Sequence, residues 1–121
     1  MSVTISTMDQ EFTNVPCQGC EDDMYVCPPG CTGVEPAPIY PELNLSNSNF
    51  CWVWSSLGME VSQDLCGSME VNSPEWNSLF ATVLLNSAIQ PRDTYAGSVI
   101  YRILTIMESV RKHNHQGISW G

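Results

Sequence analysis

Hydrophobic positions recur with helical spacing near the end of the chain and predict a helix that begins at Ser73. Ser73 suits the N-cap, Pro74 the first helical position, and Glu75 complements the positive end of the helix dipole. Pro91 ends this helix, because a proline cannot continue the hydrogen-bond ladder. Its predicted apolar face consists of Trp76, Leu79, Phe80, Val83, Leu84 and Ala88.

A second helix is predicted from Asp93 or Thr94 as N-cap to Gly117, which ends the run. Basic residues and His113 lie in its last turn, where positive charge suits the carbonyl end. The connection between the two helices is short, so they should pack as an antiparallel hairpin that supplies most of the core. The predicted stripe consists of Ala96, Val99, Ile100, Ile103, Leu104, Met107 and Val110.

Strict alternation of apolar and polar residues predicts strands earlier in the chain. Val3 and Ile5 alternate with hydroxyl residues and predict a strand over residues 2–7, or an arm that pairs with a sheet edge. Residues 50–57 give the strongest strand pattern, with Trp52 and Trp54 on one face and Cys51 on the other. Together with a turn near Gly58, they predict a β hairpin over residues 50–66.

The first forty-nine residues contain few large aliphatic side chains. Closely spaced prolines over residues 36–41 favour an extended run that would make a poor central strand, and residues 44–49 are typical of a loop. We therefore predict an extended segment over 1–49 and a core over 50–121. The expected fold is a small α+β fold: a cysteine-pinned, loop-rich N-terminal segment, a short β hairpin and a C-terminal antiparallel helix hairpin.

Four cysteines within fifteen residues are the clearest chemical signal: Cys17, Cys20, Cys27 and Cys31. The first pair has the two-residue spacing of tetrahedral zinc sites. Zinc is therefore the favoured cofactor, with an iron–sulfur cluster as an alternative four-cysteine centre. Disulfide bonding without a cofactor is a close alternative, and unliganded reduced thiols are a third.

The remaining candidate residues lie outside this cluster. Cys51 and Cys66 would face each other across the predicted hairpin and form a disulfide, or fill core positions instead. His113 and His115 are interpreted as the end of a helix rather than as metal ligands. The candidates for a protein interface are Val3, Ile5, Trp52 and Trp54, of which the tryptophans alternatively belong to the core.

Charge is distributed very unevenly. Four basic residues oppose thirteen acidic ones, for a net charge of −9, and residues 1–91 carry no Lys or Arg. Binding to nucleic acid or to an anionic membrane surface is not expected, because both need cations on one face. A basic protein partner or a divalent cation fits this balance better, and an acidic surface that is simply solvated is the other interpretation.

Neither a signal peptide nor a membrane-spanning run is visible in the sequence. Unexported cysteines normally stay reduced, but a virus particle assembles inside a cell and works outside it, where its cysteines can oxidise late. We therefore expect a location in a virion assembled in host cytoplasm, or in the cytoplasm itself.

No catalytic motif is recognised, so an enzyme is not expected. An extended arm, a proline-rich run and ordered ends favour a non-enzymatic structural or assembly subunit that contacts other protein subunits, most concretely a virus or phage particle component. The alternative is a small intracellular zinc-binding adaptor, or an inhibitor that acts on a basic partner.

Overall fold

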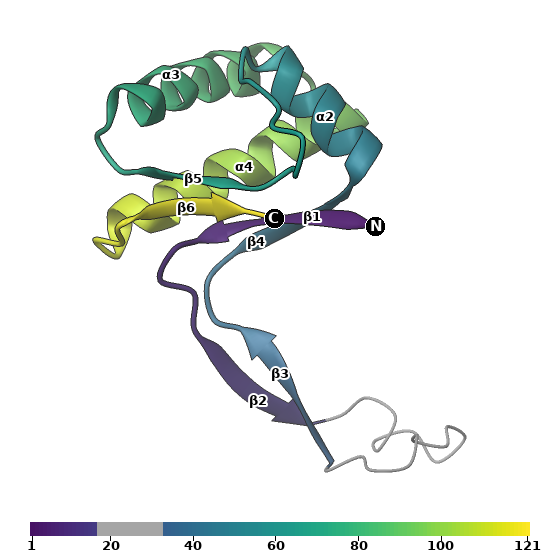
Figure 1. The fold of residues 1–121 in the computed structure, drawn as a ribbon, viewed down its shortest axis with the longest axis vertical. Coiled ribbons are helices and arrows are strands. Elements are labelled where there is room, and N and C mark those ends of the chain that lie inside the picture. The colour runs from purple at the N-terminus through teal and green to yellow at the C-terminus, as the bar shows by residue number, and fades with distance from the viewer. Residues whose placement is uncertain (17–32) are drawn as a thin grey trace. The chain divides into compact units, whose positions relative to one another are not determined.

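The computed structural model describes residues 1–16 and 33–121, and these form a small mixed α+β fold (Figure 1). Six strands in two sheets and three helices lie in these ranges, so the predicted fold class is confirmed. The elements in chain order are β1 (Ser2–Thr7), β2 (Phe12–Pro16), β3 (Val34–Pro38), β4 (Glu42–Ser46), α2 (Asn47–Ser56), β5 (Gly67–Glu70), α3 (Pro74–Ile89), α4 (Tyr95–Lys112) and β6 (Gly117–Trp120).

The described chain divides into two compact units. The first comprises Met1–Asp9 and Tyr40–Gly121, and the second comprises Gln10–Ile39. This differs from the predicted division at residue 49, because β1 and β4 pair with each other in the first unit. The sequence before residue 50 therefore contributes two strands to the main sheet.

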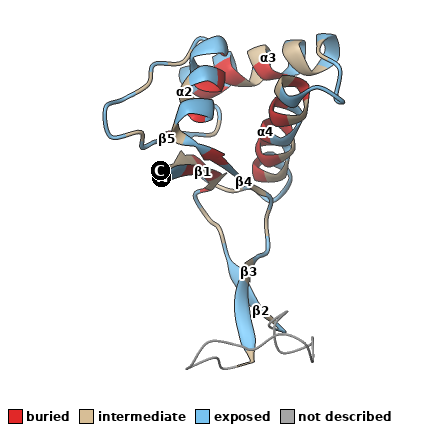
Figure 2. Ribbon diagram, turned by 90° about the vertical axis from the view of Figure 1, so that its right-hand side faces the viewer, coloured by how far each residue is buried: buried red, intermediate tan, exposed pale blue. Residues whose placement is uncertain are grey.

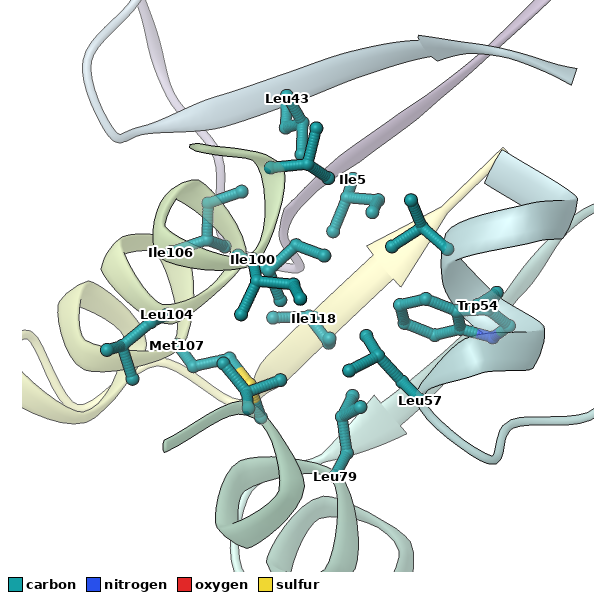
Figure 3. Packing of buried hydrophobic residues seen from close by; sticks show 14 of the residues in the cluster. Ile5, Leu43, Trp54, Leu57, Leu79, Ile100, Leu104, Ile106, Met107 and Ile118 are labelled. Carbon is teal, nitrogen blue, oxygen red and sulfur yellow. The ribbon is translucent and has the colours of Figure 1, made fainter. Parts of the chain in front are cut away.

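The sheet of the first unit has the order β4-β1-β6-β5, and each neighbouring pair is antiparallel. The predicted strand over residues 2–7 is confirmed as β1, which lies inside the sheet. Ile5 pairs with Leu43 on one side and with Trp120 on the other. Alternation places Val3 and Ile5 on the buried face, against which the helices pack (Figure 3).

The predicted strand over residues 50–57 is wrong, because this segment forms helix α2. Ser46 caps the helix, and its side chain accepts a hydrogen bond from the Asn49 main-chain N–H. Phe50, Val53 and Trp54 follow at spacings of three and one and are all buried. The alternating aromatic residues favour a strand locally, but helical spacing also buries these three against the sheet.

The C-terminal helix hairpin is confirmed as α3 and α4. Ser73 and Thr94 are the N-caps, and their side chains accept hydrogen bonds from the N–H groups of Trp76 and Gly97. Buried residues follow one face of α4, visible in Figure 2. Of the residues predicted for the apolar face of α3, Trp76 is buried as expected, whereas Leu84 is 42% exposed.

The second unit contains a two-stranded antiparallel ribbon, β2 with β3. The main-chain N–H of Ile39 donates to the Glu11 carbonyl at 2.8 Å. Main-chain N–H groups along a strand point alternately to its two sides, so those one and three positions before Ile39 point away from β2. Pro36 and Pro38 occupy such positions, where a missing N–H breaks no ladder bond. The predicted extended proline run is therefore strand β3, in which the proline nitrogens point toward the edge that is not paired with β2.

Candidate functional site

All three helices of the first unit carry large apolar side chains that are exposed. Trp52 is 54% exposed on α2, while Leu85 and Ile89 on α3 are 62% and 69% exposed. We call this set the hairpin-end surface and define it by Trp52, Leu84, Leu85, Ile89 and Tyr95. Leu85 and Ile89 are four residues apart, so they lie on one face of α3.

A hollow of about 230 Å³ lies where the three helices meet beside this surface. Its lining combines Trp52 from α2, Asn86 from α3 and its C-cap Gln90, and Ala96 and Ile100 from α4. The hollow therefore offers both apolar contact and side-chain amides that can donate and accept hydrogen bonds. This composition suits another protein better than a purely apolar ligand.

The turn between α3 and α4 is held in place by polar contacts. The side-chain amide of Asn49 donates to the Tyr95 hydroxyl at 2.9 Å, which joins α2 to the start of α4. The Arg92 guanidinium lies 3.9 Å from the ring centroid of Tyr101, within cation–π range. The first of these contacts orients Tyr95, one of the aromatic residues of the hairpin-end surface.

Three of the four predicted interface residues are instead part of the chain's own core. Val3 and Ile5 are buried on the inner face of β1, and Trp54 is fully buried on α2; Figure 3 shows Ile5 and Trp54 among the core side chains. The prediction paired Trp52 with Trp54 on one strand face, whereas a helix turns them about 200° apart. Only Trp52 remains exposed and available to a partner.

Packing around Trp54 includes one unusual feature. Its ring lies 5.2 Å from the centroid of Phe50 and 4.9 Å from that of Trp120. Its indole Nε1 is buried and has no hydrogen-bond partner within the described ranges. An unsatisfied buried donor costs about 1–3 kcal/mol, which the aromatic packing must offset.

The predicted bridge between Cys51 and Cys66 depended on the hairpin that does not form, and both thiols are free. Cys51 is half-buried on α2, as a core cysteine would be. The exposed Cys66 donates its thiol proton to the Asp64 carboxylate at 3.2 Å. This hydrogen bond raises the pKa of Cys66, because it stabilises the protonated thiol.

The four-cysteine site predicted at Cys17, Cys20, Cys27 and Cys31 lies outside the described residues. Zinc, an iron–sulfur cluster and disulfide bonding therefore remain predictions. Within 1–16 and 33–121, no group of three or more His, Cys, Asp or Glu side chains is arranged to hold a metal ion.

His115 belongs to a polar cluster where β1 meets the segment after α4. The Thr7 hydroxyl lies 2.7 Å from its Nδ1, and Tyr40 packs edge-on against its ring at 4.4 Å between centroids. A hydroxyl beside an imidazole resembles a nucleophile with its base, but the Thr7 side chain is only 2% exposed. The hydrogen bond joins the end of β1 to the segment after α4. The only signal in the sequence for the pairing of Thr7 with His115 was a threonine on the inward face of β1.

His113 has a different role at the end of α4. It is the C-cap residue, consistent with the predicted interpretation as a helix end, and its ring stacks 5.7 Å from that of His115.

None of the helices in the described part of the chain combines the length and the apolar character that a membrane span requires.

No family model matches this chain, and comparisons with curated proteins and with solved structures find no match.

Proposed function

We propose that this chain is a non-enzymatic structural or assembly subunit of a larger complex, most concretely a virus or phage particle component. The observation that carries the proposal is the hairpin-end surface. Helix α3 buries Trp76, Leu79 and Val83 on one side and exposes Leu85 and Ile89 on another. A helix that is apolar on opposite sides is typical of one buried on both, and here the described residues of the first unit cover only one side.

The size of the exposed side chains supports a stable contact. Complete burial of a leucine or isoleucine is worth about 1.5–3 kcal/mol, and an aromatic side chain buries a larger area. Leu85 and Ile89 are exposed on one face of α3, and Trp52 is exposed on α2 where it lines the hollow that the three helices border. Grouped exposure of this kind marks an interaction site, whereas single exposed apolar residues do not.

The ribbon of the second unit supports a subunit role independently. Its register places Phe12, Pro16, Val34, Pro36 and Pro38 on one face. Phe12 is 60% exposed and Val34 48% exposed. A two-stranded ribbon is marginally stable alone in water, so a neighbouring subunit that covers this face would stabilise it.

The alternative function is a small intracellular zinc-binding adaptor or an inhibitor of a basic partner. One observation favours the basic partner: residues 1–91 carry no Lys or Arg, and the whole chain has a net charge of −9. Such a charge steers association with a positively charged protein. The zinc in this alternative depends on the four cysteines discussed above.

Sedimentation velocity of the isolated chain from micromolar to millimolar concentration tests the proposal. We expect reversible association, because copies of an assembly subunit can cover the hairpin-end surface of one another. The double substitution Leu85→Glu/Ile89→Glu should abolish it by introducing charge at the contact. Both positions are exposed, so the variant should still fold, as circular dichroism can confirm.

The matched control is Ser68→Glu/Thr13→Glu, which adds the same charge at exposed strand positions. It should associate like the unsubstituted chain. A chain that stays monomeric over the whole range would argue against assembly through its own copies and favour the adaptor. Equal loss of association in both variants would show that charge alone, rather than the hairpin-end surface, controls it.

A further inference from the structure

A groove of about 490 Å³ lies between the segment after α2, β5, the start of α3 and β6. Its apolar lining is formed by Met59, Met69 and Trp120, which are buried or half-buried. Two exposed carboxylates, Glu60 and Glu75, also line it. The groove thus has an apolar interior and an acidic rim. None of its lining residues lines the hollow at the hairpin-end surface.

Trp120 is fixed in this groove by contacts on other parts of its ring. It packs against Trp54, with 4.9 Å between the ring centroids. It also lies directly over Gly67, where an added Cβ would be only 2.6 Å from Trp120 Cζ2. A glycine at this position therefore lets the indole approach the β5 backbone, and the ring stays half-exposed in a defined place.

The two rim carboxylates have no hydrogen bond or ion pair to the described part of the chain. The chain's own cations cannot supply one. Arg92, Arg102, Arg111 and Lys112 line none of this groove, and no other Lys or Arg exists in the sequence, including residues 17–32. Arg111 is already engaged, 5.1 Å from the ring centroid of Phe80. No Lys or Arg of this chain lines the groove, so a cationic side chain that pairs with Glu60 and Glu75 there comes from another molecule.

We propose that this groove binds an arginine side chain of a basic protein partner. The guanidinium lies against the Trp120 ring and pairs with Glu60 and Glu75, while its aliphatic stem contacts the two methionines. Arginine fits better than lysine because its planar group stacks on an aromatic face and pairs with two carboxylates at once. Methionine side chains adapt their shape to such a stem. This site shares no residue with the hairpin-end surface, so an experiment can contradict one of the two proposals and leave the other standing.

The test is an NMR titration of the ¹⁵N-labelled full chain with the tripeptide acetyl-Gly-Arg-Gly-amide. The same peptide with citrulline replacing arginine is the control ligand, because citrulline has nearly the same shape and no charge. We expect the arginine peptide to shift the indole N–H signal of Trp120, assigned through Trp120→Phe. The citrulline peptide should shift it little.

Substitution of the rim then identifies the charge contact. Glu60→Gln/Glu75→Gln should weaken binding about twofold to 25-fold, since each exposed ion pair is worth roughly 1.4- to fivefold in affinity. Glu11→Gln/Glu108→Gln makes the same change in net charge at two residues that do not line the groove, and should leave the affinity unchanged. All four positions are exposed, so these variants should keep the fold, as their dispersed spectra would verify.

Three results would overturn the proposal. Equal shifts by arginine and citrulline peptides would show an apolar groove without charge recognition. Equal weakening by the two double variants would show non-specific attraction to an acidic protein. Shifts confined to residues outside the groove would place the cation elsewhere.

Discussion

The Thr7 hydroxyl and Nδ1 of His115 lie 2.7 Å apart, although 108 positions separate the two residues in the sequence. The same hydroxyl accepts a hydrogen bond from the Asp9 main-chain N–H, and the Asp9 carboxylate accepts one from the Gln116 N–H at 2.7 Å. These bonds join the end of β1 to the segment that enters β6. They hold the neighbouring strands β1 and β6 in register at this end of the sheet of the first unit.

Thr7→Val keeps the side-chain shape and removes the hydroxyl, so it should lower the free energy of unfolding by about 1–3 kcal/mol. The cost arises because His115 and the Asp9 N–H lose a partner in a half-buried place. Urea denaturation measures the change. Thr13→Val is the matched control on the exposed ribbon and should change stability by no more than about 0.5 kcal/mol. Equal effects of the two substitutions would contradict a special role for Thr7.

Ile103 and Leu84 test how the helix hairpin is oriented. Ile103 is fully buried, so Ile103→Ala should cost about 2–5 kcal/mol through lost burial and a cavity. Leu84 was predicted from sequence to share this core but is 42% exposed, so Leu84→Ala should cost at most about 1.5 kcal/mol. Thermal denaturation of both variants at low concentration checks the order. A larger loss of stability for Leu84→Ala than for Ile103→Ala would show that Leu84, and not Ile103, packs in the core.

Gly97 allows the start of α4 to approach the preceding turn closely. An added Cβ would collide with the main-chain carbonyl oxygen of Pro91. Alanine favours a helix over glycine by up to about 1 kcal/mol, yet we expect Gly97→Ala to destabilise the chain by about 1–3 kcal/mol. Ser98→Ala, one position along the same helix, should stay within about 0.5 kcal/mol. A stabilised Gly97→Ala chain, measured by urea denaturation, would show that the turn can move freely.

The four-cysteine cluster predicts one zinc ion per chain. Elemental analysis of protein purified under argon, with a free-thiol count, should find that zinc bound. Cys17→Ser/Cys20→Ser should lose it, because two of four ligands are gone. Cys51→Ser/Cys66→Ser should retain it, since neither thiol belongs to the cluster. Iron in place of zinc would indicate the iron–sulfur alternative.

Two outcomes would contradict a metal centre there. Metal-free protein with four thiols missing from the count would indicate disulfides, which stabilise by about 2–4 kcal/mol each against roughly 10–16 kcal/mol for a structural zinc. Metal-free protein with all six thiols reactive would remove both explanations.

Local sequence determined the elements whose signals lie within a few residues of one another. The helix starts at Ser73 and Thr94 were predictable because a cap acts on N–H groups of its own first turn. The strand over residues 2–7 was predictable because alternation shows which side chains one sheet face can bury. The short connection before Tyr95 likewise predicts that α3 and α4 pack as a hairpin.

Tertiary structure decided what local signals left open. Residues 50–57 alternate like a strand, yet α2 forms because helical spacing places Phe50, Val53 and Trp54 together on the sheet. The pairing of β1 with β4 joins positions about forty residues apart, and no local pattern encodes such a partner. Exposure of Leu84 and burial of Thr7 also depend on which elements cover them. Local hydrogen bonds select helices and strands, but only the complete packing determines which apolar face is buried and which stays exposed.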